Sequence, residues 1–192
     1  HPAKIWIKDF DGNGVEDKII SKTADGKDKP VFMKRDVQDG LPVLKKQNLR
    51  HAEYANRSIQ ELFTADQLKD VKVREVTCMS SCVAYNKGNG RFDIVVLPPK
   101  IQLSSTHAAL VTDVNNDGFN DIILGGNEFN FQPQLGRLDA SAGAVLLGNG
   151  KGDLKLLDEP VAGLDVTGMI RDIVSVRGKG VNYLLVLINN DY

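Results

Sequence analysis

Apolar and polar residues alternate along much of the chain, in short runs separated by turn-forming residues. The run AKIWIK at residues 3–8 places apolar side chains at every second position, which is the period of a half-buried β-strand. Met169 begins a longer segment, MIRDIVSVRGKGVNYLLVLINND, that predicts a hairpin turning at Gly178 to Gly180. The same criteria predict further strands at residues 17–22, 73–86, 92–97, 107–112, 121–125, 142–148 and 153–157.

The alternation stops over roughly residues 36–70, where LPVLKKQNLRHAEYANRSIQELFTADQLKDV has the spacing of helices. Two capping boxes lie within this segment, Ser58 with Glu61 and Thr64 with Gln67. In a capping box, the side chains at the two ends of the first helical turn satisfy backbone N–H groups that would otherwise lack partners. We therefore expect a small α-helical insertion in an otherwise all-β chain.

Two nine-residue loops repeat one pattern of acids, amides and glycine: DFDGNGVED, which begins at Asp9, and DVNNDGFND, which begins at Asp113. When the two are aligned, oxygen-bearing side chains fall at positions 1, 3, 5 and 9, and glycine falls at position 6. The backbone carbonyl of position 7 offers one more oxygen. The predicted ligands are Asp9, Asp11, Asn13, Val15 and Asp17 in loop 1 and Asp113, Asn115, Asp117, Phe119 and Asp121 in loop 2.

This donor set predicts two calcium sites, because Ca²⁺ takes about 6–8 oxygen ligands and such loops supply them from alternate residues. The three carboxylates of each loop repel one another, and a divalent cation removes most of that repulsion. An EF-hand is excluded, since it needs a bidentate Glu at position 12, where the chain has Ile20 and Leu124. The alternative is a pair of ordinary turns, which explains the residue types but not the repeated spacing.

A second repeat sets the expected domain organisation. GNGRFDIVVL begins at Gly88, and GNGKGDLKLL begins 60 positions later at Gly148. A repeat of this length, with turns at matched places, predicts units that stack because they cannot bury their faces alone. We expect one partial β-propeller over residues 1–192, with about two and a half four-stranded blades. Blade 1 is residues 1–100 with the helical insertion, blade 2 is 101–160, and 161–192 start blade 3.

The loops resemble the calcium loops of FG-GAP (integrin α-like) and VCBS repeats. Those loops follow the pattern D-x-[DN]-x-[DN]-G-x-x-D, and a strand with a glycine pair often comes next, as in DIILGG from Asp121. Two departures are that loop 2 has Asn115 where Asp is commoner, and that only loop 2 is followed by the glycine pair, since loop 1 runs into IISKT.

The order of RDVQDGLPVLKK, YANRSIQELF, QPQLGRLDASAGAVLLGNGKG and IRDIVSV resembles the carboxy-terminal region of bacterial cartilage acidic protein-like surface proteins, over nearly the whole chain. The resemblance implies a β-propeller, an exported location at the cell surface or outside the cell, and a binding or adhesive role.

Composition bears on partners and location. The formal net charge of −1 gives no electrostatic footprint for nucleic acid, and no run of residues is long and apolar enough to span a membrane. The chain opens on His1, so we expect a mature product or an excised fragment. Calcium loops with dissociation constants of about 10⁻⁴–10⁻³ M suit extracellular modules, which favours an exported protein.

Other candidate chemistry is sparse. Cys78 and Cys82 share a face of the expected strand but are too far apart for a disulfide, so we expect free, half-buried thiols. His1, His51 and His107 have neither metal-ligand nor triad spacing. Trp6 and the aromatic residues of NEFNFQ, from Asn127, either pack in the core or form platforms for sugar rings.

We predict a non-enzymatic, calcium-binding adhesion or binding module with an unidentified protein or glycan ligand. The alternative is an accessory glycan-binding or partner-binding part of a polysaccharide-processing enzyme or uptake system. A hydrolase would need a carboxylate pair outside the loops, for which Asp139 and Asp172 are candidates. Because an incomplete propeller leaves open strand edges, we also expect the rest of a longer polypeptide or assembly to cover strands 3–8 and 181–189.

Overall fold

The computed structural model describes residues 3–47, 50–131, 136–158 and 162–189. The chain divides into two units, His1–Met79 and Ser80–Tyr192. The expectation of a mostly β protein is confirmed: both units contain a four-stranded antiparallel sheet, and the first also carries a short helical region. None of the helices in the described part of the chain has the length and apolar character that crossing a bilayer requires.

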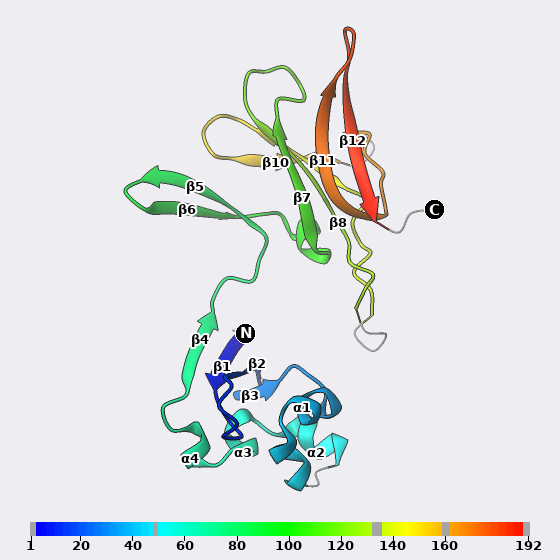
Figure 1. The fold of residues 1–192 in the computed structure, drawn as a ribbon. Helices are drawn as coiled ribbons and strands as arrows, with labels where there is room; N and C mark the ends of the chain where they lie inside the picture. The colour runs from blue at the N-terminus through cyan, green and yellow to red at the C-terminus, as the bar shows by residue number, and fades with distance from the viewer. Residues whose placement is uncertain (1–2, 48–49, 132–135, 159–161, 190–192) are drawn as a thin grey trace. The chain divides into compact units, whose positions relative to one another are not determined.

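The first unit is built on a sheet in the order β3-β2-β1-β4 (Figure 1). Its strands are β1 (Ala3–Lys8), β2 (Asp17–Ala24), β3 (Lys27–Pro30) and β4 (Lys72–Val76). The strand β3 is not among the predicted strands, because its residues KDKP lack apolar alternation. The signal for it was Asp25–Gly26, because both residues have positive φ, 53° and 72°, as a two-residue hairpin turn requires.

The predicted helical insertion is present between β3 and β4. Both capping boxes are confirmed: the Ser58 N–H donates to the Glu61 carboxylate at 2.7 Å, and the Thr64 N–H donates to Gln67 Oε1 at 3.0 Å. The insertion consists of α1 (Lys34–Gly40), η1 (Pro42–Gln47), α2 (His51–Asn56), α3 (Ile59–Leu62) and α4 (Ala65–Leu68).

The helices cover one face of the first sheet and form a core with it. Trp6 of β1 and Ile19 of β2 are buried in this core, together with Tyr54, Ile59 and other residues of the helical segment. The indole N–H of Trp6 donates to the buried Ser21 hydroxyl at 2.9 Å, so the one polar atom of this ring is satisfied. Of the two alternatives for Trp6, the structure therefore shows packing in the core.

The second unit contains a four-stranded meander in the order β10-β9-β8-β7 and two hairpins, β5–β6 and β11–β12. The strands expected at 107–112, 121–125, 142–148 and 153–157 are all found in the meander, and the hairpin expected to turn at Gly178 to Gly180 is β11–β12. The elements are β5 (Cys82–Gly88), β6 (Arg91–Val96), η2 (Pro99–Leu103), β7 (Thr106–Thr112), β8 (Asp121–Gly126), β9 (Ala144–Gly148), β10 (Leu154–Leu156), β11 (Met169–Arg177) and β12 (Asn182–Asn189).

The single strand expected over residues 73–86 is wrong, because the structure has two strands there, β4 and β5, in different sheets. β4 pairs with β1, whereas β5 pairs with β6. Between them, the N–H of Ser81 donates to the side chain of Gln102 at 2.8 Å and is not available to a strand ladder. The expected four-strand unit of 3–8, 17–22, 73–86 and 92–97 is therefore not one sheet.

The meander and the β11–β12 hairpin pack face to face in the second unit. Ala108 of β7, Ile123 of β8 and Val145 of β9 form a buried cluster with Ile170 and Ile173 of β11. The glycine pair at the end of β8 permits two close approaches, that of β11 at Gly125 and that of the backbone before β7 at Gly126. A Cβ on Gly125 would lie 2.5 Å from the Ile170 side chain, and a Cβ on Gly126 would lie 1.8 Å from the Ser105 carbonyl oxygen.

Asn127, which directly follows β8, ties the segments of the second unit together. It is fully buried and has a left-handed backbone, with φ of 80°. Its amide donates to the carbonyls of Ser141, at 2.7 Å, and Thr167, at 2.9 Å. Its side-chain oxygen accepts from the Ser104 hydroxyl at 2.8 Å and from the Ser141 N–H at 3.0 Å. Asparagine is the residue that combines these bonds with a tolerated positive φ.

Asp28 of β3 is the corresponding polar anchor of the first unit. Its carboxylate lies 3.0 Å from Lys4 Nζ and accepts hydrogen bonds from Thr23, at 2.7 Å, and Gln60, at 3.3 Å. Burial alone would raise the pKa of Asp28, but these bonds outweigh it and hold the pKa below its usual value. A lowered pKa means that the bonds stabilise the folded state above about pH 4, and that this stabilisation is lost as the pH falls through the folded-state value.

We predict that Asp28→Asn lowers the free energy of unfolding of the first unit by about 2 kcal/mol at neutral pH, because it removes a charged acceptor of several bonds. Trp6 is the only tryptophan, so its fluorescence during urea unfolding reports on this unit. The matched control is Asp25→Asn, whose side chain is 86% exposed and should change stability little. Equal effects of the two substitutions, or an Asp28→Asn effect that does not diminish as the pH is lowered below about 4, would contradict the assignment.

We predict that Asn127→Gly destabilises the second unit by about 3 kcal/mol, since it leaves buried N–H and C=O groups without partners. Glycine keeps the positive φ, so Asn127→Ala should cost about 1 kcal/mol more through backbone strain. Calorimetry and amide hydrogen exchange over residues 141–170 would measure both effects. A stability of Asn127→Gly equal to that of the wild type would show that the bonds of Asn127 contribute little.

Candidate metal centres in two equivalent loops

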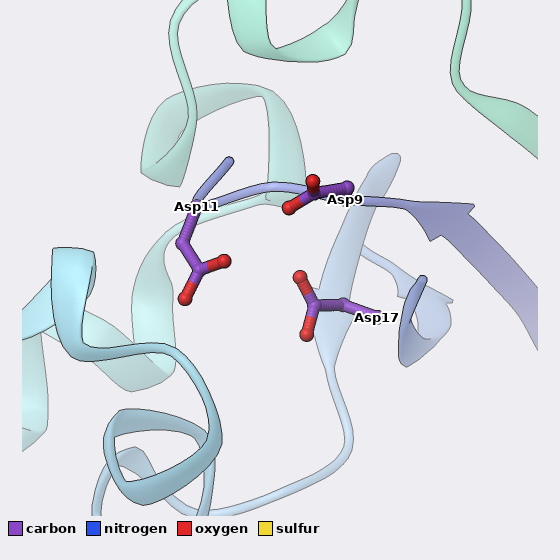
Figure 2. A group of neighbouring side chains, drawn as sticks. All are labelled: Asp9, Asp11 and Asp17. Carbon is purple, nitrogen blue, oxygen red and sulfur yellow. The ribbon is translucent and has the colours of Figure 1, made fainter. Parts of the chain in front are cut away.

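Loop 1 joins β1 to β2 and brings three carboxylates together. Asp9 directly follows β1, Asp11 lies in the loop, and Asp17 is the first residue of β2. Figure 2 shows their carboxylates gathered around one space, with Asp9 and Asp17 on one side and Asp11 on the other. One oxygen from each lies within 4.8 Å of the other two. Calcium–oxygen distances are 2.3–2.6 Å, so oxygens bound to one ion lie no more than about 5 Å apart.

The electrostatics of loop 1 show what a cation would relieve. The N–H of Gly14, with those of Gly12 and Asn13, holds the pKa of Asp9 below its usual value, because these bonds favour its charged form. Burial raises the pKa of Asp17, and the negative charges of Asp11 and Asp9 raise it further. The repulsion among the three charges therefore shows in the raised pKa of Asp17, whereas the pKa of Asp9 is lowered. The three carboxylates can hold a metal ion, which would offset that repulsion.

Loop 2 joins β7 to β8 and repeats five of the six backbone-to-side-chain hydrogen bonds of loop 1. The sixth, from the Gly12 N–H to Asp9 at 2.7 Å, has no counterpart in loop 2, all of whose residues the structure describes. In both loops the N–H groups of positions 5 and 6 donate to the two oxygens of position 1. The position-5 N–H also donates to the side chain of position 3, and the position-7 N–H donates to the side chain of position 5. The position-2 N–H donates to the carboxylate of position 9. The donor–acceptor distances are 3.1, 2.8, 3.2, 2.8 and 3.0 Å in loop 1 and 3.2, 2.9, 3.0, 2.8 and 2.9 Å in loop 2.

The backbone of the two loops also matches. Position 4 has a positive φ in both, 77° at Gly12 and 60° at Asn116. Position 6 does as well, with 88° at Gly14 and 86° at Gly118. Sequence reasoning identified the glycine at position 6 but missed position 4, where Gly and Asn are both tolerant of this conformation. The repeated spacing therefore corresponds to a repeated three-dimensional structure.

The loops differ in the arrangement of their acidic groups. In loop 2 the Asn115 amide donates to one oxygen of the Asp117 carboxylate at 2.8 Å. In loop 1 position 3 is Asp11, whose carboxylate has no N–H to donate. Within the described residues, the close three-carboxylate cluster is found in loop 1 alone. Asp121 of loop 2 is fully buried, and its second oxygen accepts from the Gly148 N–H at 2.8 Å. Val15 and Phe119, whose backbone carbonyls are the predicted position-7 ligands, are 64% and 45% exposed.

Each loop is anchored by an aromatic residue whose packing sequence reasoning did not anticipate. The buried ring of Phe10, at position 2 of loop 1, lies 4.5 Å from the ring of Phe63, and its carbonyl accepts from Gln67 of α4 at 3.3 Å. In loop 2, the Phe119 ring lies against Gly150 of the β9–β10 turn, where a Cβ would be 2.3 Å from the ring.

The other candidate residues lie outside these loops. Cys78 and Cys82 are free as expected but exposed rather than half-buried. Asp139 lines an open hollow with Asp165 and Arg137, and Asp172 is not among the described residues that line it. The side chain of Asp172 accepts from the Ile173 N–H at 2.9 Å.

The other histidine and aromatic candidates have local partners. His107 lies 3.6 Å from Glu128, which also pairs with Arg171 at 2.9 Å. Arg137 lies over the Phe129 ring at 4.0 Å, so this ring packs on a neighbouring cation. Gln132 of the NEFNFQ segment lies outside the described residues.

Comparison of the chain with protein-family models, with curated proteins and with solved structures finds no match, so the resemblance to FG-GAP and VCBS repeats depends on the loop motifs and the order of segments alone.

Proposed function

We propose that this chain is a calcium-stabilised binding module of an exported or cell-surface protein. The observation that carries the proposal is the match of five hydrogen bonds, position by position, in two loops that lie in different units. Ordinary turns would need only the local residue types. They would not need carboxylates and amides held in the same places around the same backbone curve.

Calcium is the ion that best fits the donors. Both loops offer only oxygen, from carboxylates, an amide and a carbonyl, which suits a hard cation rather than zinc or copper. A short flexible loop tolerates the irregular coordination of Ca²⁺ better than the near-ideal octahedron of Mg²⁺. Loops of this kind bind calcium at concentrations found outside the cell, which supports the exported location.

The finer architecture that we propose is a stack of propeller-like blades. The β7–β10 meander packs one face on β11–β12, and its opposite face carries a second buried cluster that includes Leu124 and Leu146. The hairpin β11–β12 is apolar on its other face as well, where Tyr183, Leu185 and Leu187 are 60%, 53% and 45% exposed. A further β-segment of the assembled protein covers this outer face.

We predict that calcium raises the melting temperature of both units. At about 2 mM Ca²⁺ and a dissociation constant on the order of 10⁻⁴ M, each site contributes roughly 1.8 kcal/mol, or several degrees. Asp11→Ala should abolish the calcium-dependent shift of the Trp6 fluorescence transition, while Asp113→Ala should abolish that of the second unit in calorimetry. Mg²⁺ should substitute poorly.

The matched control for loop 1 is Glu16→Ala, which removes a negative charge at position 8 that pairs with Lys72 at 3.3 Å. It should retain the full calcium shift. If the wild type shows no shift with calcium, or if Glu16→Ala loses it as completely as Asp11→Ala, the loops are turns with general charge effects and the proposal is wrong.

We predict that the isolated chain self-associates through the outer face of β11–β12, because an uncovered apolar sheet face and edge strand invite pairing. Sedimentation velocity over a concentration series should show reversible oligomers. Leu185→Lys should shift the distribution to monomer, whereas Leu103→Lys, at a leucine that is 62% exposed on η2, should not. A monodisperse monomer at every concentration would count against the proposed stack.

A further inference from the structure

An open groove lies beside loop 2 in the second unit. Its walls are the β5–β6 hairpin, residues 118–120 of loop 2 and the turn between β9 and β10. The volume is about 630 Å³, within the range of about 300–1,000 Å³ that small-molecule sites occupy. The proposed calcium site therefore shares a segment of chain with a cavity of ligand size.

The groove combines aromatic rings with exposed backbone. Gly152 of the β9–β10 turn has no side chain and is not covered by a neighbour, so its peptide group can be approached closely, whereas Gly150 is covered by the Phe119 ring. Phe119 contacts Gly150, and the Tyr85 ring reaches to 4.0 Å from where a Cβ of Gly152 would lie. The two rings thus flank a strip of glycine-rich backbone. Such a surface accommodates a flat ligand that has an apolar face and polar edges.

The polar lining of the groove is balanced in charge. Lys87 pairs with Asp93 at 3.2 Å, and the Asn149 amide donates to Asp153 at 2.7 Å. Lys151 supplies the second cation, so the lining holds two positive and two negative side chains. A lining without excess charge has no net attraction for an anion or a cation. It offers donors and acceptors side by side, which match hydroxyl groups, because each hydroxyl donates and accepts.

We propose that this groove binds a neutral saccharide and that Tyr85 is the surface on which a sugar ring packs. The inference deepens the proposed function and rests on it, because the ion in loop 2 orders one wall of the groove. Asp121, the position-9 ligand, accepts the Gly148 N–H at 2.8 Å and so connects the loop to the start of the β9–β10 turn. The Phe119 ring makes the second connection at Gly150.

The first experiment screens the whole chain on an array of neutral oligosaccharides of glucose, galactose, mannose and N-acetylglucosamine, with polygalacturonate as an acidic comparison. The best neutral binder is then titrated by calorimetry in millimolar calcium and in chelator. We expect binding in calcium and at least about tenfold weaker binding in chelator. No binding to any neutral saccharide, or binding to polygalacturonate alone, would overturn the inference.

Matched variants locate the site. Tyr85→Ala should weaken binding about tenfold, since it removes the aromatic contact. Ile94→Ala, on the opposite face of the same hairpin and 53% exposed, should not. Asp113→Ala should reproduce the effect of chelator. Nuclear magnetic resonance shift mapping with the bound saccharide should place the perturbed amides at 85–87, 93, 95, 118–120 and 148–154, which line the groove, and perturbations confined to other residues would overturn the assignment.

The two levels of the proposal fail separately. If calcium shifts the melts but no neutral saccharide binds, the saccharide site is wrong and the calcium module stands. If saccharide binds equally with and without calcium, the connection through Asp121 and Phe119 is wrong. If calcium has no effect on the melts, the proposed function fails whatever the array shows.

Discussion

A single carboxylate closes each loop and also starts the strand that follows it. Asp17 is the first residue of β2 and Asp121 is the first residue of β8, and each accepts the N–H of loop position 2, at 3.0 and 2.9 Å. This bond brings the two ends of the loop together, so the strands on either side leave it antiparallel and in register. The gathering of oxygens, the left-handed turns and the first hairpin of both sheets depend on it.

The same loop is used in two different surroundings. Loop 1 is anchored on helices, through the ring of Phe10 on Phe63 and its carbonyl to Gln67. Loop 2 is anchored on strands, through the buried Asp121 and the contact of Phe119 with Gly150. Where the helical insertion provides the support, three carboxylates remain close together. In loop 2 the β9–β10 turn provides the support, the Asn115 amide stands at position 3 in place of a carboxylate, and the loop borders a groove instead of a core.

Features that follow from nearby residues were predictable from the sequence. The strand period, the capping boxes and the 1-3-5-9 spacing are all local, and the structure contains the strands, helices and matched loops that they indicate. Long-range choices were not predictable. Which strand lies beside β1, the division of 73–86 by the bond from Ser81 to Gln102, and the burial of Asp121 against Gly148 each depend on residues more than twenty positions away. Asn127 was assigned to an aromatic segment, although its amide bonds reach residue 167.

The pairing of β4 with β1 has a consequence for the order of folding. In the second unit, β7 to β10 pair in sequence, so each contact closes a short segment of chain. In the first unit, Ala3 pairs with Val76, and the whole helical insertion lies between them. Bringing the ends of so long a segment together costs conformational entropy before the β1–β4 hydrogen bonds can form, and such non-local pairing slows folding. We therefore expect the local β1–β2–β3 pairs to form before β4 reaches the edge of β1.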